Sequence, residues 1–296
     1  EICACLVGSE MCIRDRIITI SAILLFALAG CGKDKQSTNE LITVDVTKNY
    51  PEKELTLQDF MDVEYIPLET NDEFVTQGKV MAIGAEVILI TNWANDGNLF
   101  VFDRKTGKAL KKINRKGQGG EEYIGITEIV LDEANKEIFV LAYTGSKISV
   151  YDLDGNFKRS FKAAGTESHV NTFNYDRENL ISYVPDNSLE NPSNAIPPYY
   201  LIFSKQDGSI TRKISIPFDE VKSPVARDGE NWENWAAPVP TAMYQIVPDH
   251  TNWVLMETSS DTIYHYLPDA NTTIPLIVRT PSIHSMDPVS YTHLRA

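Results

Sequence analysis

The cysteines, histidines and possible nucleophiles of this chain are the residues with which it could catalyse a reaction. All four cysteines lie within the first 31 residues, before the region expected to fold, so we expect no thiolate catalysis or thiolate metal site within the fold. The five histidines form neither an HxxxH nor an HExxH motif, and no GxSxG motif occurs. The sequence therefore indicates no familiar catalytic centre, and we expect no cofactor.

Two glycine-containing segments resemble ligand loops but lack residues that such loops need. GQGGEEY, residues 117–123, could hold an anion with backbone amides, but it opens no predicted helix and lacks the Lys and Ser/Thr of a nucleotide loop. YDLDGN, residues 151–156, begins like a calcium loop, yet Lys162 stands where the glutamate ligand is expected. We interpret the first as a turn between sheets and the second as a hairpin turn.

Residues 219–240 form the longest stretch without a strand pattern and contain two tryptophans. Indole faces stack on sugar rings or apolar ligands, and neighbouring amides supply hydrogen bonds. The predicted ligand-binding residues are Trp232, Trp235, Asn231 and Asn234. The alternative is that both indoles only attach the loop to the fold by burial.

Residues 104–116 contain seven basic and no acidic side chains, in a chain whose net charge is −14. Such a local reversal of charge could attract an anionic glycan, a lipid headgroup or an acidic partner. The candidate patch consists of Arg104, Lys105, Lys108, Lys111 and Lys112. The alternative is an outer strand whose lysines protect its edge against aggregation. The net negative charge argues against binding of nucleic acid.

The N-terminal region predicts export and a membrane anchor. Residues 17–28 are mostly apolar and follow Arg14 and Arg16, but they are too few to span a bilayer, so residues 17–30 are expected to be a signal peptide. Residues 28–31, LAGC, resemble the bacterial lipobox, in which the cysteine receives lipid. We therefore expect Cys31 to anchor the protein to a membrane through a polar tether, residues 31–40. Because Gly32 is not the aspartate of an inner-membrane retention signal, we favour the outer membrane, facing the periplasm.

Both ends of the chain resemble translated sequencing-adapter sequence. We therefore expect residues 1–16 and 289–296 to be artefacts, and we exclude them from the fold. The natural chain is then expected to continue beyond about residue 288, and residues 41–288 would be an incomplete domain.

From residue 62 onward, short β-rich runs alternate with turn residues, which predicts an all-β fold. Four hairpins align on Phe102, Tyr151, Phe203 and Tyr266, whose numbers differ by 49, 52 and 63. Repeats of roughly 40 to 50 residues with four strands each are typical of β-propeller blades. The sequence predicts four blades, at residues 78–115, 124–163, 169–217 and 241–279.

The segment VEYIPLET at residues 63–70, the following hairpin and GQGGEEY resemble the six-bladed β-propeller lipoproteins of Bacteroidota, which are similar to NHL-repeat propellers. The resemblance implies six four-stranded blades in the intact protein. It also implies a lipid-anchored binding or interaction module in the periplasm, and we expect that module to bind a glycan or a protein partner in sensing or nutrient uptake. Two alternatives stay open: a calcium-dependent lactonase-like hydrolase with Glu, Asn and Asp lining the channel, and a purely structural scaffold.

Overall fold

The computed structural model describes residues 41–142, 147–163, 170–185, 197–217, 225–226, 237–238, 245–257 and 259–282. The chain divides into two compact units, Glu1–Leu41 and Ile42–Ala296, and the second contains all the described strands. The predicted segments 1–16, 17–30, 31–40 and 289–296 therefore lie outside the described residues. Within the described ranges, no helix is both long and apolar enough to cross a membrane.

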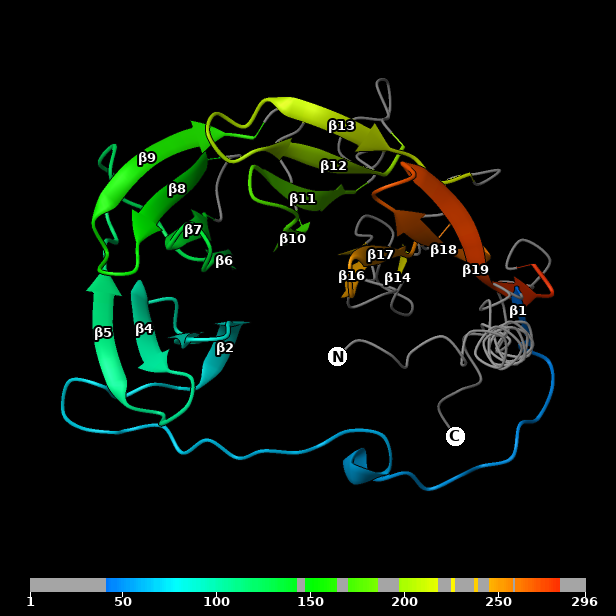
Figure 1. Ribbon diagram of the computed structural model, residues 1–296, viewed down its shortest axis with the longest axis horizontal. Helices are drawn as coiled ribbons and strands as arrows, with labels where there is room; N and C mark the ends of the chain where they lie inside the picture. Colours follow the sequence, from blue (N-terminus) through cyan, green and yellow to red (C-terminus); the bar gives the residue numbers. More distant parts are fainter. Residues whose placement is uncertain are drawn as a thin grey trace, which may run out of the picture. The chain divides into compact units, whose positions relative to one another are not determined.

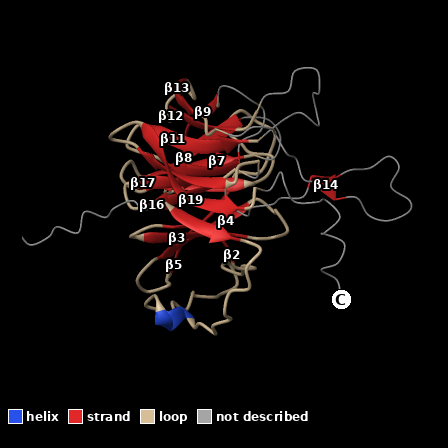
Figure 2. Cartoon of the chain, turned by 90° about the vertical axis from the view of Figure 1, so that its right-hand side faces the viewer, coloured by secondary structure: helices blue, strands red, loops and turns tan. Residues whose placement is uncertain are grey.

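The described part of the chain is built almost entirely of β-strands (Figure 2), as predicted. The single helical turn within the described residues is the 3-10 element η1 (Leu57–Asp59). Most strands belong to four antiparallel sheets, which we call blades 1 to 4 and whose order along the chain can be followed in Figure 1. They agree with the four blades predicted from the hairpin repeat.

Each blade has four strands that pair in chain order, each antiparallel to its neighbours. Blade 1 contains β2 (Lys79–Ile83), β3 (Val87–Thr91), β4 (Asn98–Asp103) and β5 (Ala109–Asn114). Blade 2 contains β6 (Glu128–Asp132), β7 (Glu137–Leu141), β8 (Lys147–Asp152) and β9 (Phe157–Lys162). Blade 3 contains β10 (Val170–Asn174), β11 (Asn179–Val184), β12 (Tyr199–Ser204) and β13 (Ile210–Ile214). Blade 4 contains β16 (Ile246–Asp249), β17 (Asn252–Leu255), β18 (Thr262–Leu267) and β19 (Thr272–Thr280).

A fifth strand extends blade 4. Strand β1 (Ile42–Asp45) pairs in parallel with the outer strand β19, with Ile42 opposite Ile277. A separate short pair, β14 (Val225–Ala226) with β15 (Ala237–Pro238), lies between blades 3 and 4 in the sequence.

The core lies between successive blades. Strands β3 and β7 are buried at every position, because each middle strand presents apolar side chains on both faces of its sheet. Three apolar clusters join blade 1 to blade 2, blade 2 to blade 3, and blade 3 to blade 4. The other face of blade 1 is covered by Ile66, Leu68 and Phe74 from the segment before β2. The outer strands β5 and β9 are largely exposed.

Candidate functional site

Two open polar clefts lie between neighbouring blades. Each is lined by residues of two kinds of turn, the one that joins the first strand of a blade to its second and the one that joins the third strand to the fourth. The cleft between blades 2 and 3 has a volume of about 520 Å³. It is lined by Asn135, Glu137, Lys158, Arg177, Glu178, Asn179, Ser204, Gln206 and Thr211. The cleft between blades 3 and 4 has a volume of about 320 Å³. It is lined by Tyr175, Asp176, Asn179, Ile202, Thr211, Arg212, Thr251, Trp253, Pro268 and Asp269.

The two clefts share a wall. Asn179 and Thr211 line both of them, and the Thr211 hydroxyl donates a hydrogen bond to Asn179 Oδ1 at 2.8 Å. Both residues belong to blade 3, on strands β11 and β13, so the two clefts adjoin at this hydrogen-bonded pair. We call the two clefts together the polar groove.

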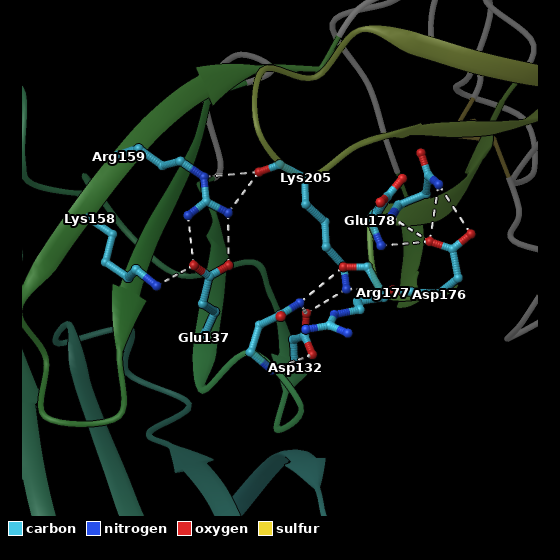
Figure 3. Close-up of polar contacts among 10 residues, drawn as sticks. Asp132, Glu137, Lys158, Arg159, Asp176, Arg177, Glu178 and Lys205 are labelled. Atoms are coloured by element: carbon cyan, nitrogen blue, oxygen red, sulfur yellow. Dashed lines mark hydrogen bonds and ion pairs between the residues drawn. The ribbon is translucent and has the colours of Figure 1, made fainter.

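A buried carboxylate forms one wall of the groove between blades 2 and 3 (Figure 3). Arg159 donates two parallel hydrogen bonds of 2.7 Å to Glu137, and Lys158 Nζ lies 2.5 Å from the same carboxylate. Burial raises the pKa of Glu137, but the hydrogen bonds from Arg159 and Lys158 outweigh burial and hold the pKa below its usual value. Arg159 also donates to the Lys205 carbonyl oxygen at 2.8 Å, which joins blade 2 to blade 3.

Behind this wall lies a fully buried ion pair (Figure 3). Lys205 and Asp132 have side chains that are each 1% exposed, and Lys205 Nζ lies 2.5 Å from Asp132 Oδ2. Lys205 also donates to the carbonyl oxygen of Asp176, while Asn135 donates to Asp132. The pair therefore fixes the turns of blades 2 and 3 from which the groove is built, and it faces the protein interior rather than a ligand.

The cleft between blades 3 and 4 has an aromatic wall. The rings of Tyr175 and Trp253 stack with centroids 5.9 Å apart and an interplanar angle of 25°. Arg212 donates a hydrogen bond of 2.6 Å to the Tyr266 hydroxyl, and burial, with a smaller contribution from the Tyr266 hydrogen bond, raises the pKa of Tyr175. Asp269 on the β18–β19 turn is exposed at the rim. The groove thus offers amides, hydroxyls, both signs of charge and an aromatic surface, which suits a polar ligand with apolar faces.

No group of three or more His, Cys, Asp or Glu side chains within the described ranges is placed to bind a metal ion. The two glycine-containing segments are turns, as predicted. In residues 117–123, the carbonyl oxygens of Gly120 and Glu122 accept hydrogen bonds from Lys147 of blade 2. In residues 151–156, Asp152 accepts hydrogen bonds from the backbone N–H groups of Asp154 and Asn156.

The predicted basic patch lies on the β4–β5 turn and on β5, which is an edge strand. Arg104 lies 3.9 Å from Glu64, Lys111 lies 3.8 Å from Asp154, and Lys112 lies over the Phe100 ring at 5.7 Å. Lys105 and Lys108 are exposed in the turn. An edge position suits the interpretation that these lysines protect the strand from aggregation, and binding of an anionic partner stays a prediction.

The predicted lipidation site Cys31 and the predicted ligand residues Trp232, Trp235, Asn231 and Asn234 lie outside the described residues. Sequence reasoning did not find the polar groove, whose residues come from turns and strand ends of three blades. Its only sequence signal is the recurrence of Asp, Asn and Gly at the hairpin turns, as in YDREN and KQDGS, and that pattern also describes ordinary turns.

Four successive four-stranded antiparallel sheets, packed face to face, define a β-propeller. The chain belongs to the family described as 6-bladed β-propeller, whose model matches residues 32–295. The six-bladed family predicted from the sequence is therefore confirmed.

Among solved structures, the chain is similar to a protein of Bacteroides fragilis described as exported, with a TM-score of 0.52 and 18% identity. The match covers 81% of this chain and 60% of that protein, so the chain spans about 60% of its length. A virginiamycin B lyase of Staphylococcus aureus matches with a TM-score of 0.41 and 13% identity over 69% of this chain and 56% of that one. BamB from Moraxella catarrhalis matches with a TM-score of 0.35 and 12% identity over 67% and 49%. No match was found among curated proteins.

Proposed function

We propose that this β-propeller is a lipid-anchored envelope protein that binds glycans in the polar groove. The observation that carries the proposal is that the two clefts adjoin at Asn179 and Thr211, whose hydrogen-bonded side chains line both of them. An oligosaccharide has hydroxyl groups along its edges and apolar faces on its rings. The groove supplies hydrogen-bonding groups from both clefts and, at one end, the half-buried ring of Tyr175, which is backed by the buried Trp253.

The location proposed for this module is the outer membrane, facing the periplasm, in a bacterium of the Bacteroidota. Two observations support it: LAGC at residues 28–31 follows an apolar run, and the similar protein of Bacteroides fragilis is described as exported. A propeller tethered there could present a glycan to an uptake or sensing system. The calcium-dependent lactonase and the structural scaffold stay predictions of the family resemblance.

Cys31→Ala is expected to release the protein from the membrane. Each buried acyl methylene contributes about 0.8 kcal/mol, so loss of the chains removes essentially all the binding energy of the anchor. The measurement is detergent partitioning and intact mass of both forms expressed in a Bacteroidota host. Equal partitioning and masses that differ only by the substituted side chain would contradict the anchor.

A glycan array on the full chain, followed by titration of the strongest hit, tests the groove. Asp269→Ala and Arg177→Ala each remove an exposed group from one of the two clefts, and we expect each to weaken binding about tenfold or more, the loss of one hydrogen bond to a charged group. Asp72→Ala is the matched control, because Asp72 is exposed and lies outside both clefts. A hit that binds all variants equally would place the ligand elsewhere. If the array gives no hits and a protein partner is cross-linked at the groove, the ligand of the groove is a protein and the glycan proposal is wrong.

A further inference from the structure

Trp93 is a large aromatic side chain that the fold holds out into solvent. It lies between β3 and β4 of blade 1 and is 70% exposed. Its loop is fixed by hydrogen bonds to the segment before β2. Asn92 Oδ1 accepts from the Gln77 backbone N–H at 2.8 Å, and Ala94 N–H donates to Gln77 Oε1 at 3.0 Å. Within the loop, the side-chain amide of Asn92 donates a hydrogen bond of 2.8 Å to Asp96 Oδ2.

The ammonium group of Lys79 lies over the exposed indole ring. Lys79 Nζ lies 5.2 Å from the centroid of the Trp93 ring, within the range of a cation–π contact. Lys79 begins β2 and pairs with Thr91 of β3, so the sheet sets its position relative to the loop. Within the described residues Lys79 forms no ion pair, although the chain carries a net charge of −14. The ammonium group therefore has no described protein counter-ion.

We propose that Trp93, Lys79 and Gln77 form a binding site for the acidic sugar units of a glycan, of the uronic acid class. The apolar face of such a ring stacks on the indole, its carboxylate pairs with Lys79, and the Gln77 amide nitrogen donates to a hydroxyl group. Gln77 Oε1 is already used by Ala94, which orients the amide and leaves its N–H groups for the ligand.

The three groups together discriminate between classes of ligand. A neutral sugar stacks on the indole but brings no charge to the ammonium group. A phosphatidylglycerol headgroup pairs with the ammonium group but has no ring face for the indole. A ring that carries a carboxylate uses both groups, and the low entropic cost of holding an indole with two rotatable bonds favours a stacking role.

This site is separate from the polar groove. The β3–β4 loop lies at the opposite strand ends from the turns that line the groove, because successive turns of an antiparallel sheet alternate between its two ends. The inference rests on the proposed glycan function in naming a sugar, but its residues are different. Variants of Trp93 and variants of Asp269 therefore test the two sites independently.

The test is calorimetric titration of the full chain with tetragalacturonate and with its methyl ester, which has the same rings without the charges. We expect the parent to prefer the acid at least fivefold. Trp93→Ala is expected to weaken binding of both at least tenfold, and Lys79→Gln to abolish the preference for the acid while the ester still binds. Tyr65→Ala and Lys53→Gln are the matched controls, because both side chains are exposed and both lie outside this site.

Three results would overturn the inference: no binding of tetragalacturonate by the parent, equal affinity for acid and ester, or unchanged affinity in Trp93→Ala. Binding to phosphatidylglycerol vesicles that depends on Lys79 but not on Trp93 would assign the site to a membrane surface instead. Circular dichroism of Trp93→Ala should match the parent, since a side chain this exposed contributes little to the core. Should the variant unfold, Trp93→Phe, which keeps a smaller ring, is expected to show intermediate affinity. Full parental affinity in that variant would count against the indole.

Discussion

Lys205→Met is expected to destabilise the protein by about 3–5 kcal/mol, because it leaves the Asp132 carboxylate buried without its counter-charge. Both side chains are 1% exposed, so water cannot replace the missing ammonium group. The loss should appear as a lower midpoint of urea unfolding, followed by tryptophan fluorescence. It should also weaken ligand binding at the groove, whose turns this pair joins.

The matched control is Arg104→Met. Arg104 occupies the same place in the turn between the third and fourth strands of blade 1 as Lys205 does in blade 3. In each blade its backbone N–H donates a hydrogen bond of 2.8 Å to a carbonyl oxygen of the first turn, that of Glu86 for Arg104 and that of Glu178 for Lys205. Arg104, however, pairs at 3.9 Å with Glu64, whose side chain is 74% exposed, so its loss should cost less than about 1 kcal/mol.

A double variant separates the charge from the packing. Lys205→Met with Asp132→Leu removes both charges, and most of the lost stability should return, since apolar side chains can replace a buried ion pair. If Lys205→Met unfolds at the same urea concentration as the parent, the pair does not hold blades 2 and 3 together.

Gly208→Ala is expected to destabilise the protein by about 3 kcal/mol or more. Gly208 has φ +73°, which costs a side-chain-bearing residue about 1–2 kcal/mol. In addition, a Cβ atom there would lie 2.2 Å from the carbonyl oxygen of Lys162 in blade 2, a backbone atom that cannot move aside without shifting the blade. The backbone strain and the steric clash therefore both act where this turn of blade 3 contacts blade 2.

Gly78→Ala is the control that isolates the loss of stability caused by the positive φ alone. Gly78 has nearly the same φ, +75°, but a Cβ atom there would meet nothing within 4 Å. We expect a loss of about 1–2 kcal/mol, measured by the same urea titration. Equal losses at the two glycines would show that blades 2 and 3 are not in close contact at this turn.

The hairpins were predictable because their signals are local. Gly107, Gly155 and Gly208 follow strands of alternating β-rich sequence, and all three adopt the positive φ that their turns require. The order of the blades follows from the repeat, since each sheet must bury both faces against its neighbours.

Contacts between distant residues were not predictable. Lys205 and Asp132 are 73 positions apart, and a lysine in the turn KQDG has the same composition as an ordinary solvated turn. The pairing of β1 with β19 joins residues from opposite ends of the domain, and no pattern in ITVD specifies that partner. The polar groove depends on such packing, because it exists only where turns of three blades are brought together.

The Trp93 site illustrates a different difficulty. Its sequence, TNWANDGN, is a polar loop with one aromatic residue, and the exposure of that residue depends on the bonds that Asn92 and Gln77 form. Sequence reasoning favoured Trp232 and Trp235, because two tryptophans in a long irregular segment are a stronger compositional signal than one in a short turn.

Hydrogen–deuterium exchange of the full chain, with and without a saturating glycan from the array, tests the binding proposal most directly. The proposal predicts slower exchange at the two turns of blade 3 that line the groove, residues 175–179 and 204–211, since a ligand that binds only the native groove suppresses local opening there. Asp269→Ala should reduce that protection in proportion to its loss of affinity. Protection confined to residues 219–240, with none at the two turns, would contradict the groove as the binding site.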